Sequence, residues 1–109
     1  MADDPFGRIF DALADPNRRY MLRTLAERET ATATELAAEL PVTRQAVAKH
    51  LAMLGDAGLV TARRAGRETR YELTPEPLAQ ATDWVAEVNA AWDERLGALT
   101  RHLGGRKRR

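Results

Sequence analysis

Apolar residues recur along this chain at helical spacing in five stretches, and two shorter runs have a composition typical of strands. The predicted helices cover residues 5–14, about 16–26, 33–40, 43–56 and 76–103. The strand-like runs, residues 59–64 and 68–73, flank a short turn at Ala65-Gly66-Arg67 and predict a β-hairpin. The pattern therefore predicts a mainly α chain of the α+β class, with one two-stranded hairpin before a long last helix.

Capping residues mark the starts of three of these helices. Asp15 is a favourable N-cap, and it precedes Pro16, which suits the first helical position. Thr32 and Glu35 have the spacing of a capping box, and Thr43 is a good N-cap after a turn that contains proline. The third and fourth helices are then joined by a turn of three or four residues, which is the helix-turn-helix arrangement.

The fourth predicted helix has two faces of different chemistry. Val47, Leu51 and Leu54 repeat at intervals of four and three, so we expect their face in the core. The opposite face combines small side chains with long hydrogen-bonding ones, which lets the backbone approach DNA while a few side chains reach base edges and phosphates. We expect this recognition helix to enter the major groove, with contacts from Thr43, Arg44, Gln45, Ala48 and Lys49.

The hairpin, about residues 59–73, follows the helix-turn-helix, about residues 33–56, and this is the position of a wing. Hairpin arginines are usually solvated, but beside a recognition helix we expect them to contact phosphates or the minor groove. The arginines on or beside the turn are Arg63, Arg64, Arg67 and Arg70. Gly58 is a better candidate than Gly55 for the left-handed residue that ends the recognition helix.

The last predicted helix, residues 76–103, has an apolar stripe along most of its length. A helix of this length extends about 40 Å, farther than the preceding domain needs to cover. We expect part of the stripe to pack on a second copy of the chain, assisted by the first helix; the alternative is a helix folded wholly onto its own core. The expected dimer interface comprises Phe6, Phe10, Leu78, Trp84, Val85, Val88, Trp92, Leu96 and Leu99.

Composition narrows the class of protein. A chain of 109 residues, 44% of them hydrophobic, suits one domain, predicted at residues 1–103. Residues 104–109 are predicted to be a basic flexible tail, which either touches DNA nonspecifically or has no role. The absence of cysteine excludes disulfides and thiolate chemistry. No run approaches the roughly 18 apolar residues of a membrane span, and the N-terminus is acidic, so we expect a cytoplasmic protein without membrane partners.

The formal net charge is only +1, but its distribution is uneven. Residues 43–73 contain six basic and three acidic residues, whereas residues 1–42 contain five and eight, and residues 74–103 contain two and five. Positive charge is therefore concentrated in the recognition helix and the wing, as expected of a protein with one side facing a polyanion. A merely solvated basic face is the alternative.

The polar chemistry does not favour an enzyme. The chain has two separated histidines, no nucleophile elbow and no phosphate-binding glycine loop. His50 borders the buried helix face, and we favour a hydrogen-bonded structural histidine over a base-reading one. Arg18 and Arg19 lie in a first helical turn, where the helix dipole disfavours cations, so they either meet a phosphate or an acidic neighbour or are simply solvated.

Several motifs resemble the ArsR/SmtB family of bacterial winged-helix repressors. They are Leu13-Ala-Asp-Pro-Asn-Arg-Arg-Tyr-Met-Leu22, Glu35-Leu-Ala, Val42-Thr-Arg-Gln-Ala-Val-Ala-Lys-His-Leu51, Leu54-Gly-Asp-Ala-Gly-Leu-Val60 and Gly66-Arg-Glu-Thr-Arg-Tyr-Glu-Leu73. The last helix, with Trp84, Trp92 and Leu99, is similar to the SdpR-like, autorepressor-type branch. The resemblance implies a homodimer on double-stranded DNA, at a partly palindromic operator of its own or a nearby operon. It also implies DNA contacts from residues 43–45, 48 and 49 and from the wing.

Two departures from the family pattern bear on function. Ala48 stands where the family has a serine, which removes one possible hydroxyl contact to DNA. Metal-responsive members have cysteines in the third helix or paired Asp and His ligands in the last, and neither is present, so we expect no cofactor and no metal sensing. Control by protein abundance or by an unknown small apolar ligand then remains open. A winged helix used as a protein-interaction module is the rival function, although its exposed face would be expected to show apolar anchors.

Overall fold

Side-chain caps start three of the helices, as the sequence predicted. In the computed structural model, which describes Asp4 and residues 6–103, Asp15 accepts hydrogen bonds from two first-turn amides at 2.8 and 3.1 Å. Thr32 and Glu35 form the reciprocal capping box, with both bonds at 3.0 Å, and the Thr43 hydroxyl accepts from the amide three residues on at 3.0 Å. These bonds satisfy amides that the helix itself leaves without acceptors.

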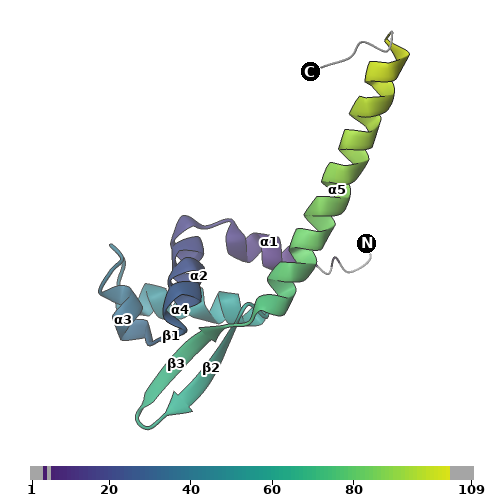
Figure 1. Ribbon diagram of the computed structural model, residues 1–109. Coiled ribbons are helices and arrows are strands. Elements are labelled where there is room, and N and C mark those ends of the chain that lie inside the picture. The colour runs from purple at the N-terminus through teal and green to yellow at the C-terminus, as the bar shows by residue number, and fades with distance from the viewer. Residues whose placement is uncertain (1–3, 5, 104–109) are drawn as a thin grey trace. The chain divides into compact units, whose positions relative to one another are not determined.

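Figure 1 shows the order of the elements. They are α1 (Gly7–Leu13), α2 (Pro16–Arg28), β1 (Thr30–Ala31), α3 (Ala33–Ala37), α4 (Arg44–Asp56), β2 (Val60–Ala65), β3 (Glu68–Leu73) and α5 (Pro75–His102). The chain divides into two units, residues 1–78 and 79–109. The first contains the elements from α1 to β3 and the start of α5, and the described part of the second is the remainder of α5. The predicted tail, residues 104–109, lies outside the described residues.

The sheet has one strand more than the predicted hairpin. Strand β1 pairs antiparallel with β3, so that the order is β1-β3-β2 and Ala31 lies opposite Tyr71. Glu29, the one described non-glycine residue with positive φ (73°), turns the chain from α2 into β1. A strand of two residues has too few positions to show an alternating pattern, which is why the sequence did not indicate it.

Two helix ends also differ from the prediction. Helix α2 continues to Arg28 rather than about Ala26, and α3 ends at Ala37 instead of about residue 40. Residues 38–43 therefore form the connection in the helix-turn-helix, which is longer than the predicted three or four residues, and two hydrogen-bonded turns open it. The proline at position 41 disfavours helical backbone at the residue before it, so the helix cannot extend through this connection.

Glycines shape both ends of the hairpin. Gly58 (φ 78°) follows α4, where its amide bonds to the Gly55 carbonyl and the next amide bonds to the Leu54 carbonyl, which is a Schellman motif. The predicted left-handed position is thus confirmed. Gly66 (φ 66°) and Arg67 form a two-residue turn between the paired Ala65 and Glu68, as in a type II′ hairpin.

The core of the first unit is aliphatic, and α1, α2, α3, α4 and the sheet all contribute to it. The large side chains that are fully buried are Met21, Leu25, Leu36, Val47, Leu51, Leu54 and Leu59. All three apolar residues predicted on the inner face of the recognition helix are among them. In the second unit, by contrast, the large apolar side chains of the α5 stripe are exposed, and Trp92 in its middle is 56% exposed.

Candidate nucleic-acid interface

Helix α4 has an exposed face opposite its buried one. The five residues expected to contact DNA are all exposed; they are Thr43, Arg44, Gln45, Ala48 and Lys49. Helix α3 packs against α4, and the α4 residues Val47 and Leu51 are buried in the core. One face of α4 therefore packs in the core. The opposite face is exposed and carries two cationic side chains and one amide side chain.

Arg44 has a fixed orientation at the start of α4. Its Nε donates a 2.8 Å hydrogen bond to Thr34 Oγ1 in α3. Within the described part of the chain its two terminal nitrogens have no hydrogen bond, so a planar pair of donors stays available. This fork is the group that recognises a guanine edge or a phosphate in a two-bond geometry.

A groove of about 510 Å³ separates the helix-turn-helix from the wing. Its lining comes from the start of α3, the exposed face of α4 and the distal half of the hairpin: Thr32, Ala33, Thr34, Glu35, Arg44, Ala48, Arg67, Glu68, Thr69 and Tyr71. The small side chain of Ala48 leaves room there. The arginines of the helix and of the hairpin turn thus meet around one open groove.

The hairpin register separates the predicted wing arginines onto two faces of the sheet. Arg64 lies opposite Thr69, on the face that also carries Tyr71 of the groove, because directly paired residues share a face. Arg63 lies on the other face, 3.6 Å from the Glu72 carboxylate. Arg64 and Arg67 are exposed; Arg67 lies in the hairpin turn and lines the groove, and Arg64 lies in β2 opposite Thr69 of the groove lining.

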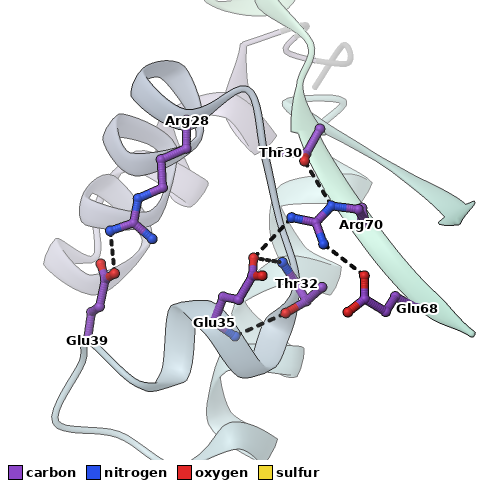
Figure 2. A network of polar contacts seen from close by, with 7 residues as sticks. All are labelled: Arg28, Thr30, Thr32, Glu35, Glu39, Glu68 and Arg70. Carbon is purple, nitrogen blue, oxygen red and sulfur yellow. Dashed lines mark hydrogen bonds and ion pairs between the residues drawn. The ribbon is translucent and has the colours of Figure 1, made fainter.

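Arg70 has a different environment from the other three. Figure 2 shows its guanidinium bonded to three side chains: Nε donates to Thr30 Oγ1 (2.9 Å), Nη1 to Glu68 (2.9 Å) and Nη2 to Glu35 (3.1 Å). Its side chain is only 25% exposed. These bonds engage every nitrogen of the guanidinium, which argues against the direct DNA contact expected from its place in the hairpin.

The carboxyl group of Glu35 is stabilised in its charged form. The hydrogen bond from the Thr32 amide is the largest cause that lowers the pKa of Glu35 below its usual value. Desolvation, the second cause in size, opposes it, and the nearby charge of Arg70 and its hydrogen bond lower the pKa further. Glu39, near the end of α3, forms an ion pair with Arg28 and accepts a hydrogen bond from the Tyr20 hydroxyl. Both ends of α3 are therefore linked to neighbouring elements by charged groups.

Arg18 and Arg19 both bond to the preceding helix, so Arg18 is not simply solvated, and its charge also acts on the carboxylate of an acidic neighbour, Asp15. Arg18 is buried (9% exposed) and donates to the carbonyls of Asp11 and Ala12, while Arg19 donates to the Leu13 carbonyl. These carbonyls lie in the last turn of α1, where the helix provides few amide donors and cations are favourable, and the Asp11 carbonyl also accepts from the Ala14 amide at 3.2 Å. Only the tertiary packing of α1 on α2 brings donors and acceptors together, so the sequence carried no signal of it.

His50 joins α4 to the same cluster. Its Nδ1 lies 3.2 Å from Arg18 Nη1, and because a guanidinium only donates, Nδ1 is the acceptor. Arg18 Nη1 also donates to the Met53 sulfur at 3.4 Å. This half-buried position agrees with the structural role favoured for His50 over base reading.

The residues expected at the dimer interface lie on α5, on α1 and at the start of the chain. Val85, Val88, Trp92, Leu96 and Leu99 are exposed on one stripe of α5. The rings of Phe6 and Phe10 lie 6.2 Å apart in a tilted arrangement, and Phe10 is exposed. A monomeric protein rarely exposes so long an apolar stripe.

Residues 4 and 6–103 contain no group of three or more His, Asp or Glu side chains that could hold a metal ion. Nor does any helix in this described part have the length and apolar character that spanning a membrane requires.

Comparison with known proteins identifies the family. A helix-turn-helix domain family matches residues 13–63. The uncharacterized HTH-type transcriptional regulator YuzN of Bacillus subtilis is 46% identical over 76 residues (64% of this chain, 83% of YuzN). The HTH-type transcriptional regulator CmtR of Mycobacterium tuberculosis is 38% identical over 93 residues (85% of this chain, 78% of CmtR).

Among solved structures, an ArsR-like transcriptional regulator from Rhodococcus sp. RHA1 superposes with a TM-score of 0.77 at 38% identity, covering 89% of this chain and 91% of that one. The likeness includes the winged helix and not only the helix-turn-helix segment. The chain belongs to the ArsR/SmtB family of winged helix-turn-helix transcriptional repressors, and it is a DNA-binding regulator, not an enzyme.

Proposed function

We propose that this repressor reads its operator with the first two turns of α4 and holds the flanking backbone with the wing. Arg44 and Gln45, at the start of α4, reach base edges; Ala48 allows the close approach, and Thr43 and Lys49 contact phosphates or bases. Arg64 and Arg67 contact phosphates or the minor groove. The observation that carries this proposal is the groove that α4 and the hairpin share, with Arg44 and Arg67 both in its lining.

The protein is a homodimer in this proposal, joined through the α5 stripe with help from Phe6 and Phe10. The support is the run of exposed large apolar side chains along α5, which water disfavours and a second copy would cover. A two-fold pair can set its recognition helices about 34 Å apart, one turn of DNA, so that both enter successive major grooves of a partly palindromic operator. As a bacterial-type repressor of its own or an adjacent operon, the protein would act in the cytoplasm, where the chromosome lies.

Operator binding is proposed to need no metal. The solution structure of CmtR, 41% identical to this chain, is described as that of a cadmium metal-sensor. This chain contains no cysteine, so thiolate ligands for a soft metal are absent from its whole sequence. Zinc, cadmium and arsenite should therefore leave the protein bound to its operator. Release by a stoichiometric amount of any of them would contradict the proposal.

The test begins with the DNA upstream of the protein's own coding region. Footprinting should give a protected, partly palindromic segment, and affinity should fall steeply with salt because phosphate contacts release counterions. If this upstream fragment stays unprotected at protein concentrations below those that saturate nonspecific sites, the proposed self-regulation is wrong. Binding that does not depend on salt concentration would show that the assigned phosphate contacts are wrong.

Two wing variants give a matched comparison. Arg67→Ala should weaken binding to operator and to random DNA alike and lower the salt slope by about 1. Arg63→Ala removes the same charge from the same hairpin, but Arg63 lies 3.6 Å from the Glu72 carboxylate, so the salt slope should stay close to that of the unmodified protein. Equal slopes for both variants would show that the Glu72 ion pair does not keep Arg63 from DNA.

A further inference from the structure

The unexpected feature of the wing is the position of Arg70 between two acidic side chains. Its three hydrogen bonds, all between 2.9 and 3.1 Å, join Thr30 of β1, Glu68 of β3 and Glu35 of α3. We call Thr30, Thr32, Glu35, Glu68 and Arg70 the wing–helix network (Figure 2). The network bonds the strand that carries the wing to the first turn of the helix-turn-helix.

The helix end of this network is itself constrained. The Glu35 oxygen that accepts from Arg70 also accepts from the Thr32 amide at 3.0 Å, and the Thr32 hydroxyl accepts from the Glu35 amide. Arg70 is thus bonded to a closed capping box, not to a side chain that rotates freely. A planar guanidinium with three acceptors in different directions has little freedom to turn.

Both sides of the DNA-facing groove are connected to this network. On one side, α3 packs on α4 and supplies Thr34, the acceptor for Arg44. On the other, β3 leads back to the hairpin turn with Arg67 and pairs with Arg64 on β2. A change in the Arg70 bonds would therefore alter the separation between α4 and the wing arginines, which must fit the spacing of the DNA backbone.

The network also governs charge beside the groove. Glu35 and Glu68 both belong to its lining, and Arg70 lies within hydrogen-bonding distance of each. Without Arg70, two carboxylates would face the path of the phosphates, and their repulsion would oppose binding.

We propose that Arg70 is a positioning residue that sets the wing against the recognition helix and neutralises the two groove carboxylates, instead of a residue that contacts DNA. The inference rests on the proposed DNA-binding mode. It assigns to one wing arginine a role opposite to that of Arg64 and Arg67: an effect on affinity without a phosphate contact.

Lysine substitution separates the two roles because it preserves the charge and removes the three-way hydrogen bonding. A phosphate contact tolerates lysine, whereas the Arg70 bonds require a planar fork. Arg70→Lys should therefore lose about tenfold in operator affinity while its salt slope remains that of the unmodified protein. The matched control, Arg67→Lys, should stay within about threefold in affinity.

A second measurement needs no DNA. Amide hydrogen exchange should become faster at Thr32 and along β1 in Arg70→Lys and in Arg70→Gln, and should be unchanged in Arg67→Lys, because Arg70 donates to Thr30 of β1 and to the Glu35 oxygen that accepts from the Thr32 amide. The same data report whether each variant is folded, since the amides of α4 must keep their protection.

The proposal is overturned if Arg70→Lys binds the operator as tightly as the unmodified protein while Arg70→Gln lowers the salt slope by about 1, the behaviour of a phosphate contact. It is also overturned if exchange at Thr32 and β1 is unchanged in both Arg70 variants. Failure of the unmodified protein to bind any duplex would instead defeat the proposed DNA-binding mode, and the exchange data would still decide whether Arg70 holds the wing.

Discussion

Helices α4 and α5 both have an apolar stripe at helical spacing, but the two stripes end in opposite environments. In α4 the residues of the stripe are at most 1% exposed, as Leu51 is, whereas Trp92 in the middle of the α5 stripe is 56% exposed. The remaining face of α4 carries the groups that are proposed to meet DNA. In α5 the remaining face carries Asp83, Glu87 and Glu94, which suit solvent.

This difference in exposure shows that the same helical spacing of apolar residues can have two different roles. A period of 3.6 residues shows that one face avoids water, but it does not show what covers that face. Elements of the same chain cover the α4 stripe, so it stabilises the fold of a single molecule. The α5 stripe, in the proposed dimer, stabilises an assembly, and its contribution should then depend on protein concentration.

The largest expected effect is on the covered stripe. Leu51→Ala should lower the free energy of unfolding by about 2–5 kcal/mol, because it leaves a cavity in a fully buried site. Denaturant unfolding measures this, and the loss should be the same at low and high protein concentration. Leu96→Ala on α5 is the matched control, since its cost should appear chiefly as a lower midpoint at low concentration. A concentration-independent loss of equal size in both variants would erase the distinction between the two stripes.

Next in size is the effect of a charge in the exposed stripe. Trp92→Glu should weaken the dimer by roughly 2–4 kcal/mol, the range for a central aromatic anchor, and should abolish operator binding at salt levels where the unmodified protein stays bound. Sedimentation at tens of micromolar measures the assembly. Ala90→Glu, on the opposite and exposed side of α5, adds the same charge and should leave the dimer intact. A monomeric unmodified protein, or a monomeric Trp92→Glu with full operator affinity, would defeat the dimer proposal.

A smaller effect should follow from the outward face of α4. Arg44→Ala and Gln45→Ala should each weaken operator binding by about 1–3 kcal/mol and binding to random DNA far less, since base contacts discriminate and phosphate contacts do not. Competition between the two DNAs gives both values from one titration. Equal losses on both DNAs would identify the changed residue as a phosphate contact.

The smallest effect concerns α3, the helix on which α4 packs, and it depends on pH. The pKa of Glu35 is lowered in the folded protein, first by the Thr32 amide and then by Arg70, so its charged form stabilises the fold above the ordinary glutamate value of about 4.3. The contribution is lost as pH falls through the lowered pKa. The difference in unfolding free energy between the unmodified protein and Glu35→Gln should thus be steady near neutral pH and vanish in acid. A difference in unfolding free energy that grows as pH falls would contradict a stabilising role for the charged carboxylate.

Local sequence determined much of this protein by itself. The caps at Asp15, Thr32 and Thr43, the left-handed Gly58 and the two-residue hairpin turn all depend on residues a few positions apart. Such short-range preferences act before any tertiary contact forms, so the chain order of helices, turn and wing was predictable. The buried face of α4 was predictable for the same reason, because periodicity alone separates it from the exposed face.

Only the tertiary structure decided how the arginines are used. Arg18 and Arg19 donate to the last carbonyls of helix α1, Arg63 pairs with Glu72, and Arg70 bonds to α3, although all four are the same residue type. Most of their partners come from other elements or across the sheet, up to 40 positions away along the chain. The role of a long charged side chain depends on which acceptors lie within about 3 Å of its guanidinium, and that distance is set by packing and strand register, which residue type and spacing do not specify.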